Sequence, residues 1–275
     1  MSEQPRWPFQ EGKSGMGGFD QLLGTDFGDR PTSDADEVIY AGLDHPERHR
    51  ARVPGLVAVL TDSAAPDRER FLACAALTTW GEPAGYRAVA DAAESGKRAP
   101  WYGILVDRKF SVDSTFAQLA VALGDSRDMA EEKGTLPQRE SAFRALVRIA
   151  DTEYFEDQLG DLLDESTARS LRADISETVD RGVGSLTGIV GVRPHFDLAT
   201  QLVDLAGAVA SVDGVLAAKL ALAVLEVEPS RRALLHAVTV LHRSSAAEVR
   251  RLGSYMIAVG DERVRGMATD ALRTA

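Results

Sequence analysis

The sequence predicts an all-α fold of about ten to twelve helices, and three observations support this prediction. The hydrophobic fraction is 44%, but only 6% of residues are aromatic, and Ala, Leu and Val dominate the hydrophobic set. Strand-rich folds usually carry more aromatic and β-branched residues. Hydrophobic residues recur at helical spacing over most of the chain after residue 53, and no segment alternates as an amphipathic strand does.

The first segment, residues 1–37, is rich in glycine and contains Pro5, Pro8 and Pro31. Glycine and proline interrupt regular structure, so we predict a loop or extended arm with a short helix near 19–23. Because the arm also carries aromatic residues such as Trp7 and Phe9, we expect it to lie over the first helices.

The next segment shows helical periodicity from Val53. It predicts helices at 53–60, at 67–80 with Gly81 as a stop, and from Pro83 onward. Residues 96–113 contain Pro100 and Gly103 and are predicted to be a connecting loop, with a short strand at 104–106 as the alternative.

Hydrophobic faces then resume and predict the remaining helices. Ser166 and Thr167 are candidates to cap one of them, and 182–195 is predicted to be a short helix between loops. The predicted ranges are 116–123, 143–150, 155–163, 171–179, 202–212, 215–227, about 230–242, 246–259 and 261–273.

The two ends of the chain share one plan, in which an apolar helix and a short turn precede a helix with an early arginine and a later glycine. Val249-Arg250 and Val264-Arg265 begin such helices, and Asp62 lies in the first turn. This pattern resembles the HEAT (armadillo-type) repeat family over about 53–93 and 231–275. The resemblance implies an irregular α-solenoid of helix pairs, because a two-helix unit buries both faces only by stacking on its neighbours.

The resulting domain prediction is a Gly/Pro-rich arm at 1–37 and a HEAT-like repeat domain at 38–275. The repeat pattern is weak at about 96–200, which we therefore treat as an atypical centre. A repeat fold of this kind supports many functions and specifies none of them.

The charge distribution predicts a class of partner. The net charge is −11, which argues against general affinity for nucleic acid or an anionic membrane. Residues 151–180 hold ten acids and two arginines, a balance of −8, whereas 229–275 holds eight arginines and four acids, a balance of +4. We therefore expect a basic protein partner at an acidic face. The candidate residues are Glu153, Glu156, Asp157, Asp161, Asp164 and Glu165.

Several short motifs resemble catalytic or ligand sites without their required context. Gly12-Lys13-Ser14 has the end of a phosphate-binding loop, but the first glycine of that motif would fall on Trp7. His45 and His49 have metal-ligand spacing, yet Pro46 lies between them, so we predict a solvated loop there. Cys74 lies in an apolar run and is predicted to be a core residue. We expect no metal and no cofactor.

The absence of a basic and apolar leader predicts a cytoplasmic protein. The longest apolar stretch, 202–227, contains Asp204, Asp213 and Lys219, so we expect no membrane span.

The favoured function is a non-enzymatic adaptor, regulator or immunity-type protein, which are bacterial proteins of this general appearance. The alternative is a HEAT-like nucleic-acid binder or an enzyme similar to the HEAT-like DNA glycosylases. Its phosphate contacts would be Arg250, Arg251, Arg263 and Arg265 in the C-terminal repeat.

Overall fold

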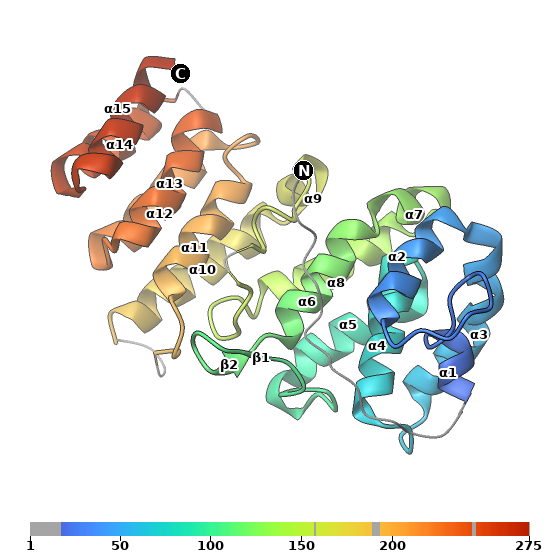
Figure 1. Ribbon diagram of the computed structural model, residues 1–275. Coiled ribbons are helices and arrows are strands. Elements are labelled where there is room, and N and C mark those ends of the chain that lie inside the picture. Colours follow the sequence, from blue (N-terminus) through green and yellow to red (C-terminus); the bar gives the residue numbers. More distant parts are fainter. Residues whose placement is uncertain (1–17, 157, 189–192, 244–245, 275) are drawn as a thin grey trace. The chain divides into compact units, whose positions relative to one another are not determined.

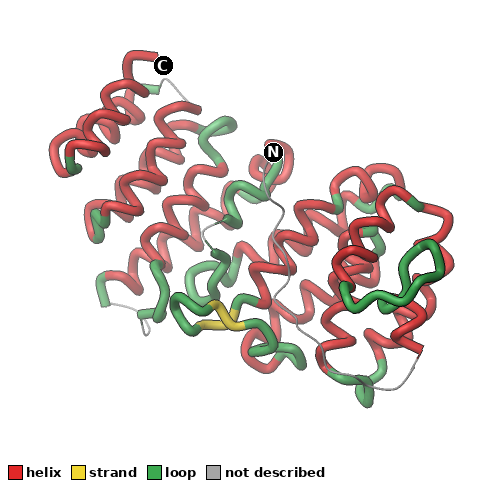
Figure 2. The backbone as a smooth tube through the Cα atoms, viewed as in Figure 1, coloured by secondary structure: helices red, strands yellow, loops and turns green. Residues whose placement is uncertain are grey.

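The structure is a computed structural model that describes residues 18–156, 158–188, 193–243 and 246–274 (Figure 1). Helices dominate these residues, as the sequence predicts, and the regular structure besides them is slight (Figure 2). The described part contains fifteen α-helices, more than the ten to twelve expected, with one 3₁₀ turn, η1 (Gly96–Arg98), and one pair of two-residue strands, β1 (Val106–Asp107) and β2 (Val112–Asp113).

The chain forms two compact units, which are described separately. Unit 1 comprises residues 1–106 and 121–143, and unit 2 comprises 107–120 and 144–275. The helices of unit 1 are α1 (Gly18–Leu22), α2 (Ala35–Asp44), α3 (Pro46–Thr61), α4 (Asp67–Thr79), α5 (Pro83–Ser95) and α7 (Arg127–Glu132). Those of unit 2 are α9 (Glu165–Ser170), α10 (Arg172–Leu186), α11 (Leu198–Ala208), α12 (Gly214–Val227), α13 (Arg231–Arg243), α14 (Ala247–Val259) and α15 (Glu262–Thr274). Helices α6 (Thr115–Asp125) and α8 (Leu136–Val147) contribute residues to both units.

Helix α4 is the centre of unit 1. Every residue from Phe71 to Thr79 is buried, because α2, α3 and α5 pack around the helix. Its many alanines permit this close approach, since small side chains let helix axes come near. The helix ends at Thr79 and is followed by Gly81, whose φ of 75° suits glycine, so the predicted helix and stop are both confirmed.

Helix α3 begins at Pro46, seven residues before the predicted start at Val53. Proline suits the first turn of a helix, so Pro46 starts α3, whereas Pro54 lies inside it. The prediction of a solvated loop is wrong for His49, which lies on α3 with 0% exposure, whereas His45 is exposed between α2 and α3. Residues 47–52 are polar or small, so this first part of α3 shows no hydrophobic periodicity from which a helix could be predicted.

The helices of unit 2 pack in two interleaved series. Helix α10 contacts α12, which contacts α14, and α11 contacts α13, which contacts α15. Each helix from α10 to α15 also packs on the next along the chain. Helix α11 is buried along its whole length, and Asp197 and Asp213 cap α11 and α12 by accepting hydrogen bonds from backbone N–H groups.

Some predicted elements differ from the structure. The helix predicted at 155–163 is wrong, because this segment forms turns, and α8 ends at Val147 rather than near Ala150. Helix α10 continues to Leu186, so the segment 182–195 does not begin with a loop before a separate short helix as predicted, and its residues 189–192 lie outside the described residues. Three helices were not predicted separately: α2, α7 and α9. In the part of the chain that the structure describes, no helix combines the length and apolar character needed to cross a bilayer.

Candidate functional site

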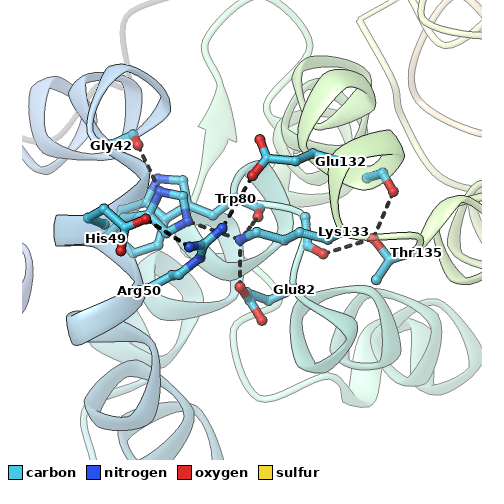
Figure 3. A network of polar contacts seen from close by, with 11 residues as sticks. Gly42, His49, Arg50, Trp80, Glu82, Glu132, Lys133 and Thr135 are labelled. Carbon is cyan, nitrogen blue, oxygen red and sulfur yellow. Dashed lines mark hydrogen bonds and ion pairs between the residues drawn. The ribbon is translucent and has the colours of Figure 1, made fainter.

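The densest polar network in unit 1 centres on Lys133, the residue that follows α7 (Figure 3). Its ammonium donates to the Glu82 carboxylate at 2.6 Å, to the Trp80 carbonyl at 2.6 Å and to His49 Nε2 at 2.9 Å. We call Lys133, Glu82, Trp80 and His49 the Lys133 cluster. An ammonium has three N–H groups, so these three acceptors use its full donor capacity.

The turn after α4 brings two of these acceptors, the Trp80 carbonyl and the Glu82 carboxylate, to Lys133. Gly81 and Glu82 follow α4 in a turn, which directs the Trp80 carbonyl and the Glu82 side chain toward Lys133 (Figure 3). Thr135 joins the same turn by donating from Oγ1 to the Gly81 carbonyl at 2.9 Å. The cluster therefore fastens the end of α7 to the α4–α5 turn.

His49 has a defined tautomer in this network. Its Nδ1 lies 2.8 Å from the Gly42 carbonyl and can only donate there, so Nε2 is the acceptor for Lys133. Burial lowers the pKa of His49, and the nearby Lys133 ammonium lowers it further. The imidazole is accordingly held neutral, and a second ring proton would displace the hydrogen bond from Lys133.

Trp80 completes the packing around His49. The two rings stack with centroids 4.9 Å apart, and the indole Nε1 donates to the Ile39 carbonyl at 2.8 Å. Gly42 lies directly against the indole, and a Cβ at this position would overlap the ring. The cluster could not be predicted from the sequence, because its members are spread over 49–133 and no short motif links them.

The cluster is built for rigidity rather than for bond chemistry. The side chains of Lys133 and Glu82 are only 14% and 19% exposed, and the donors of Lys133 are all engaged. A nucleophilic lysine needs an amine that is free to reach a substrate, whereas this amine is bound to three acceptors. Among the described residues, no group of three or more His, Cys, Asp or Glu side chains could hold a metal ion.

Cys74 is a core residue of α4, as its apolar run suggests. It is 0% exposed, and burial raises the pKa of its thiol to about 12. Thiolate chemistry is therefore suppressed at this position.

The six predicted acidic residues do not share one surface environment. Glu153 is buried and Glu156 is half-buried, whereas Asp161 and Glu165 are exposed. Asp164 caps α9 by accepting from the Thr167 N–H. Ser166 and Thr167, the predicted caps of the helix at 171–179, do not cap α10, which follows Leu171 without a side-chain cap. Asp157 lies outside the described residues.

Two buried side chains of α11 hold the turns between α8 and α9. Gln201 Nε2 donates to the Ala150 and Glu153 carbonyls at 2.6 and 2.9 Å, and its Oε1 accepts from the Phe155 N–H at 2.7 Å. Asp204 accepts from the Gly160 N–H at 2.7 Å. A Cβ on Gly160 would overlap the Asp204 backbone, so glycine permits this approach.

Glu156 is the strained member of the acidic segment, with a φ of 56° that non-glycine residues rarely adopt. Burial raises the pKa of its carboxyl, and the nearby Asp107 carboxylate raises it as well, while a 3.4 Å hydrogen bond from Gln118 opposes this. Tyr154 packs beside it between Phe110 and Phe196, with centroids 5.5 and 5.3 Å apart.

The four arginines of the alternative function are all exposed on α14 and α15. No carboxylate among the described residues forms an ion pair with Arg250, Arg251, Arg263 or Arg265. Arginine ion pairs of unit 2 lie elsewhere, as between Arg181 and Asp151 at 2.9 Å.

No protein-family model, curated protein or solved structure matches the chain.

Proposed function

We propose that this protein is a non-enzymatic interaction module that holds a basic protein partner, and that its helix pairs form an irregular α-solenoid of the HEAT-like kind. The interleaved packing of α10 to α15 supports the repeat part of the proposal, since solenoid repeats contact only their neighbours along the chain. Such stacking leaves long helix faces available to a partner.

One observation carries the choice of partner. The carboxylates of Asp161, Glu165, Glu177 and Asp180 are exposed on one short stretch of unit 2. Glu177 and Asp180 form no ion pair with any described residue, whereas Glu165 is paired with Arg169 and Asp161 lies 3.5 Å from Arg243. Exposed carboxylates steer a basic partner and fix its register on the surface.

The experiment compares two variants with the same change of charge. Glu177→Lys/Asp180→Lys reverses the proposed surface, and Glu226→Lys/Glu262→Lys reverses exposed acids elsewhere in unit 2. Immobilised full-length proteins are exposed to lysate at low and at high salt, and the bound proteins are identified. We expect the wild type and the control pair to retain one stoichiometric basic protein at low salt and to release it at high salt, and the α10 pair to retain none.

Retention of the same protein by the α10 pair, or capture of no basic protein by the wild type, would contradict the proposal. The bound protein is then produced separately, and its affinity for each variant is measured by calorimetry.

A second candidate function is phosphate binding by α14 and α15. It is favoured by one observation, namely that Arg250, Arg251, Arg263 and Arg265 are exposed without an ion-pair partner among the described residues. Nucleic acid in the eluate, lost in Arg250→Gln/Arg251→Gln and kept in the α10 pair, would replace the first function with this one. The affinity of the protein for nucleic acid should then fall steeply as the salt concentration rises.

A further inference from the structure

Unit 1 contains a pocket that lies outside the Lys133 cluster. It has a volume of about 410 Å³ and is lined by α3, α4, α5 and the segment at Pro100 and Trp101. Pockets for small ligands commonly measure about 300–1,000 Å³. The Lys133 cluster and the exposed acids of unit 2 contribute no residue to it.

The pocket exists because the helix face above it is built from small side chains. Ala84, Ala88 and Ala92 follow one another at intervals of one helical turn on α5 and line one wall. Val57 of α3 and the buried Trp101 provide the larger apolar surfaces. Most of the lining is therefore suited to an apolar group.

The polar lining places two cations beside this apolar surface. Arg70 is held in position, because its Nε donates to the Leu60 carbonyl at 3.3 Å and its guanidinium lies 5.8 Å from the Trp101 ring centroid. Its side chain is only 15% exposed, and its ion pair with Asp67 is long, at 3.4 Å. A partly desolvated guanidinium is a strong donor to a carboxylate.

Arg87 is the second cation, and it is exposed at the pocket. Among the described residues, its guanidinium has no hydrogen-bond or ion-pair partner. Asp91 lies one turn later on α5, also lines the pocket, and pairs with neither arginine in the described part of the chain. Because Arg70 keeps its long ion pair with Asp67, Arg87 is the guanidinium of the pocket that no described carboxylate pairs.

From this arrangement we propose that the pocket binds a small monocarboxylate with an apolar body. The carboxylate is received by Arg87 and Arg70, and the apolar body lies against the alanines of α5 and Trp101. Charge complementarity selects a single anionic group, because Asp91 would repel a second one.

The test uses 4-phenylbutyrate as the probe, with 4-phenylbutanol as its neutral counterpart. Full-length ¹⁵N-labelled protein is titrated, and the indole N–H signal of Trp101 is assigned by its loss in Trp101→Phe. We expect a saturable shift of this signal with 4-phenylbutyrate and at least about tenfold weaker binding of 4-phenylbutanol, because the alcohol cannot accept a charge-assisted hydrogen bond.

Three variants locate the binding. Arg87→Gln should weaken it about tenfold, Ala88→Leu should weaken it by placing a larger side chain in the pocket, and Arg48→Gln, which changes an exposed arginine of α3 outside the pocket, should leave it unchanged. Arg48 and Arg87 are exposed on helices and Ala88 is half-buried on α5, and unchanged spectra elsewhere verify folding.

Asp91→Asn distinguishes the proposed ligand class from a zwitterion. Removing this carboxylate should tighten 4-phenylbutyrate, because it relieves repulsion between like charges. The proposal is overturned if 4-phenylbutyrate and 4-phenylbutanol bind alike, if Arg87→Gln has no effect, or if phenylalanine binds better than 4-phenylbutyrate and loses its binding in Asp91→Asn.

Discussion

At the scale of single residues, the polar side chains of unit 1 act through saturation of their hydrogen bonds. Lys133 meets three acceptors within 2.9 Å, and His49 is fixed between the Gly42 carbonyl and Lys133. Buried polar groups are stable only when their partners are present, so each member depends on the others. None of these contacts could be predicted from the sequence, because the residues lie on different elements and only the fold brings them together.

The first prediction concerns Lys133→Met, which preserves the length of the apolar stem and removes the charge. It leaves the Glu82 carboxylate and the Trp80 carbonyl partly buried without their donor, so we expect a loss of about 2–4 kcal/mol in the free energy of unfolding. Urea denaturation followed by tryptophan fluorescence measures it. Lys97→Met, at an exposed lysine of unit 1, should change the same quantity by less than about 0.5 kcal/mol. Equal effects of the two substitutions would show that the cluster is not structural.

The second prediction is a pH dependence that belongs to His49. Its pKa is lowered in the folded state, so the unfolded state binds more protons as the pH falls below the ordinary value of 6.5. The stability that the neutral ring contributes is present above that pH and is lost toward the folded-state pKa, by at most about 1.4 kcal/mol per pH unit. His49→Gln should be less stable than the wild type at pH 7.5, and the gap should narrow at pH 5. A gap that widens as the pH falls would mean that folding stabilises the imidazolium.

At the scale of elements, the helix predictions are correct where hydrophobic periodicity is clear. They are wrong where long-range polar contacts determine the backbone conformation. The helices α13, α14 and α15 begin within one residue of their predicted starts, and α4 matches its prediction. The segment 155–163 has the same kind of apolar spacing, yet it forms turns. Its backbone forms short-range turn bonds, such as Gln158 N–H to the Phe155 carbonyl. The N–H groups of Phe155 and Gly160 instead donate to Gln201 and Asp204 of α11, and such long-range partners are invisible in a local pattern.

The third prediction compares two glycines. Gly160→Ala should destabilise the protein by about 1–3 kcal/mol, because its Cβ would overlap the Asp204 backbone and force the turns apart. Gly266→Ala should stabilise it by about 0.5–1 kcal/mol, because an added Cβ there meets no atom within 4 Å and alanine favours α15. Thermal unfolding of both variants measures the difference. The two changes in stability must have opposite signs. If Gly160→Ala left the stability unchanged, α11 would not hold these turns closely.

At the scale of the whole molecule, the sequence shows where acidic residues are concentrated, and the structure shows which of them are exposed. The ten acids of 151–180 suggest a continuous acidic face, but Asp151 and Glu153 are buried and Asp174 is bound by Arg144 and Arg148. What remains exposed is a smaller set around α9 and α10. Burial of an acid beside an arginine depends on packing, so a count of charges could not distinguish these two groups.

The exposed acids also lie in a particular part of the predicted repeat. The ends of the chain carry the HEAT-like pattern, and the atypical centre predicted at 96–200 contains the strand pair and the turns held by α11. The acids around α9 and α10 lie in the same stretch of sequence. A partner bound there would contact the part of the chain in which the HEAT-like sequence pattern is weakest.

The most direct test of the proposed function is amide hydrogen exchange of the full-length protein, alone and with its captured partner. We predict slower exchange over 161–186, with no change in α14 and α15. Protection confined to 247–274, or no protection of α9 and α10, would contradict the proposal that this protein holds a basic partner through its exposed acids.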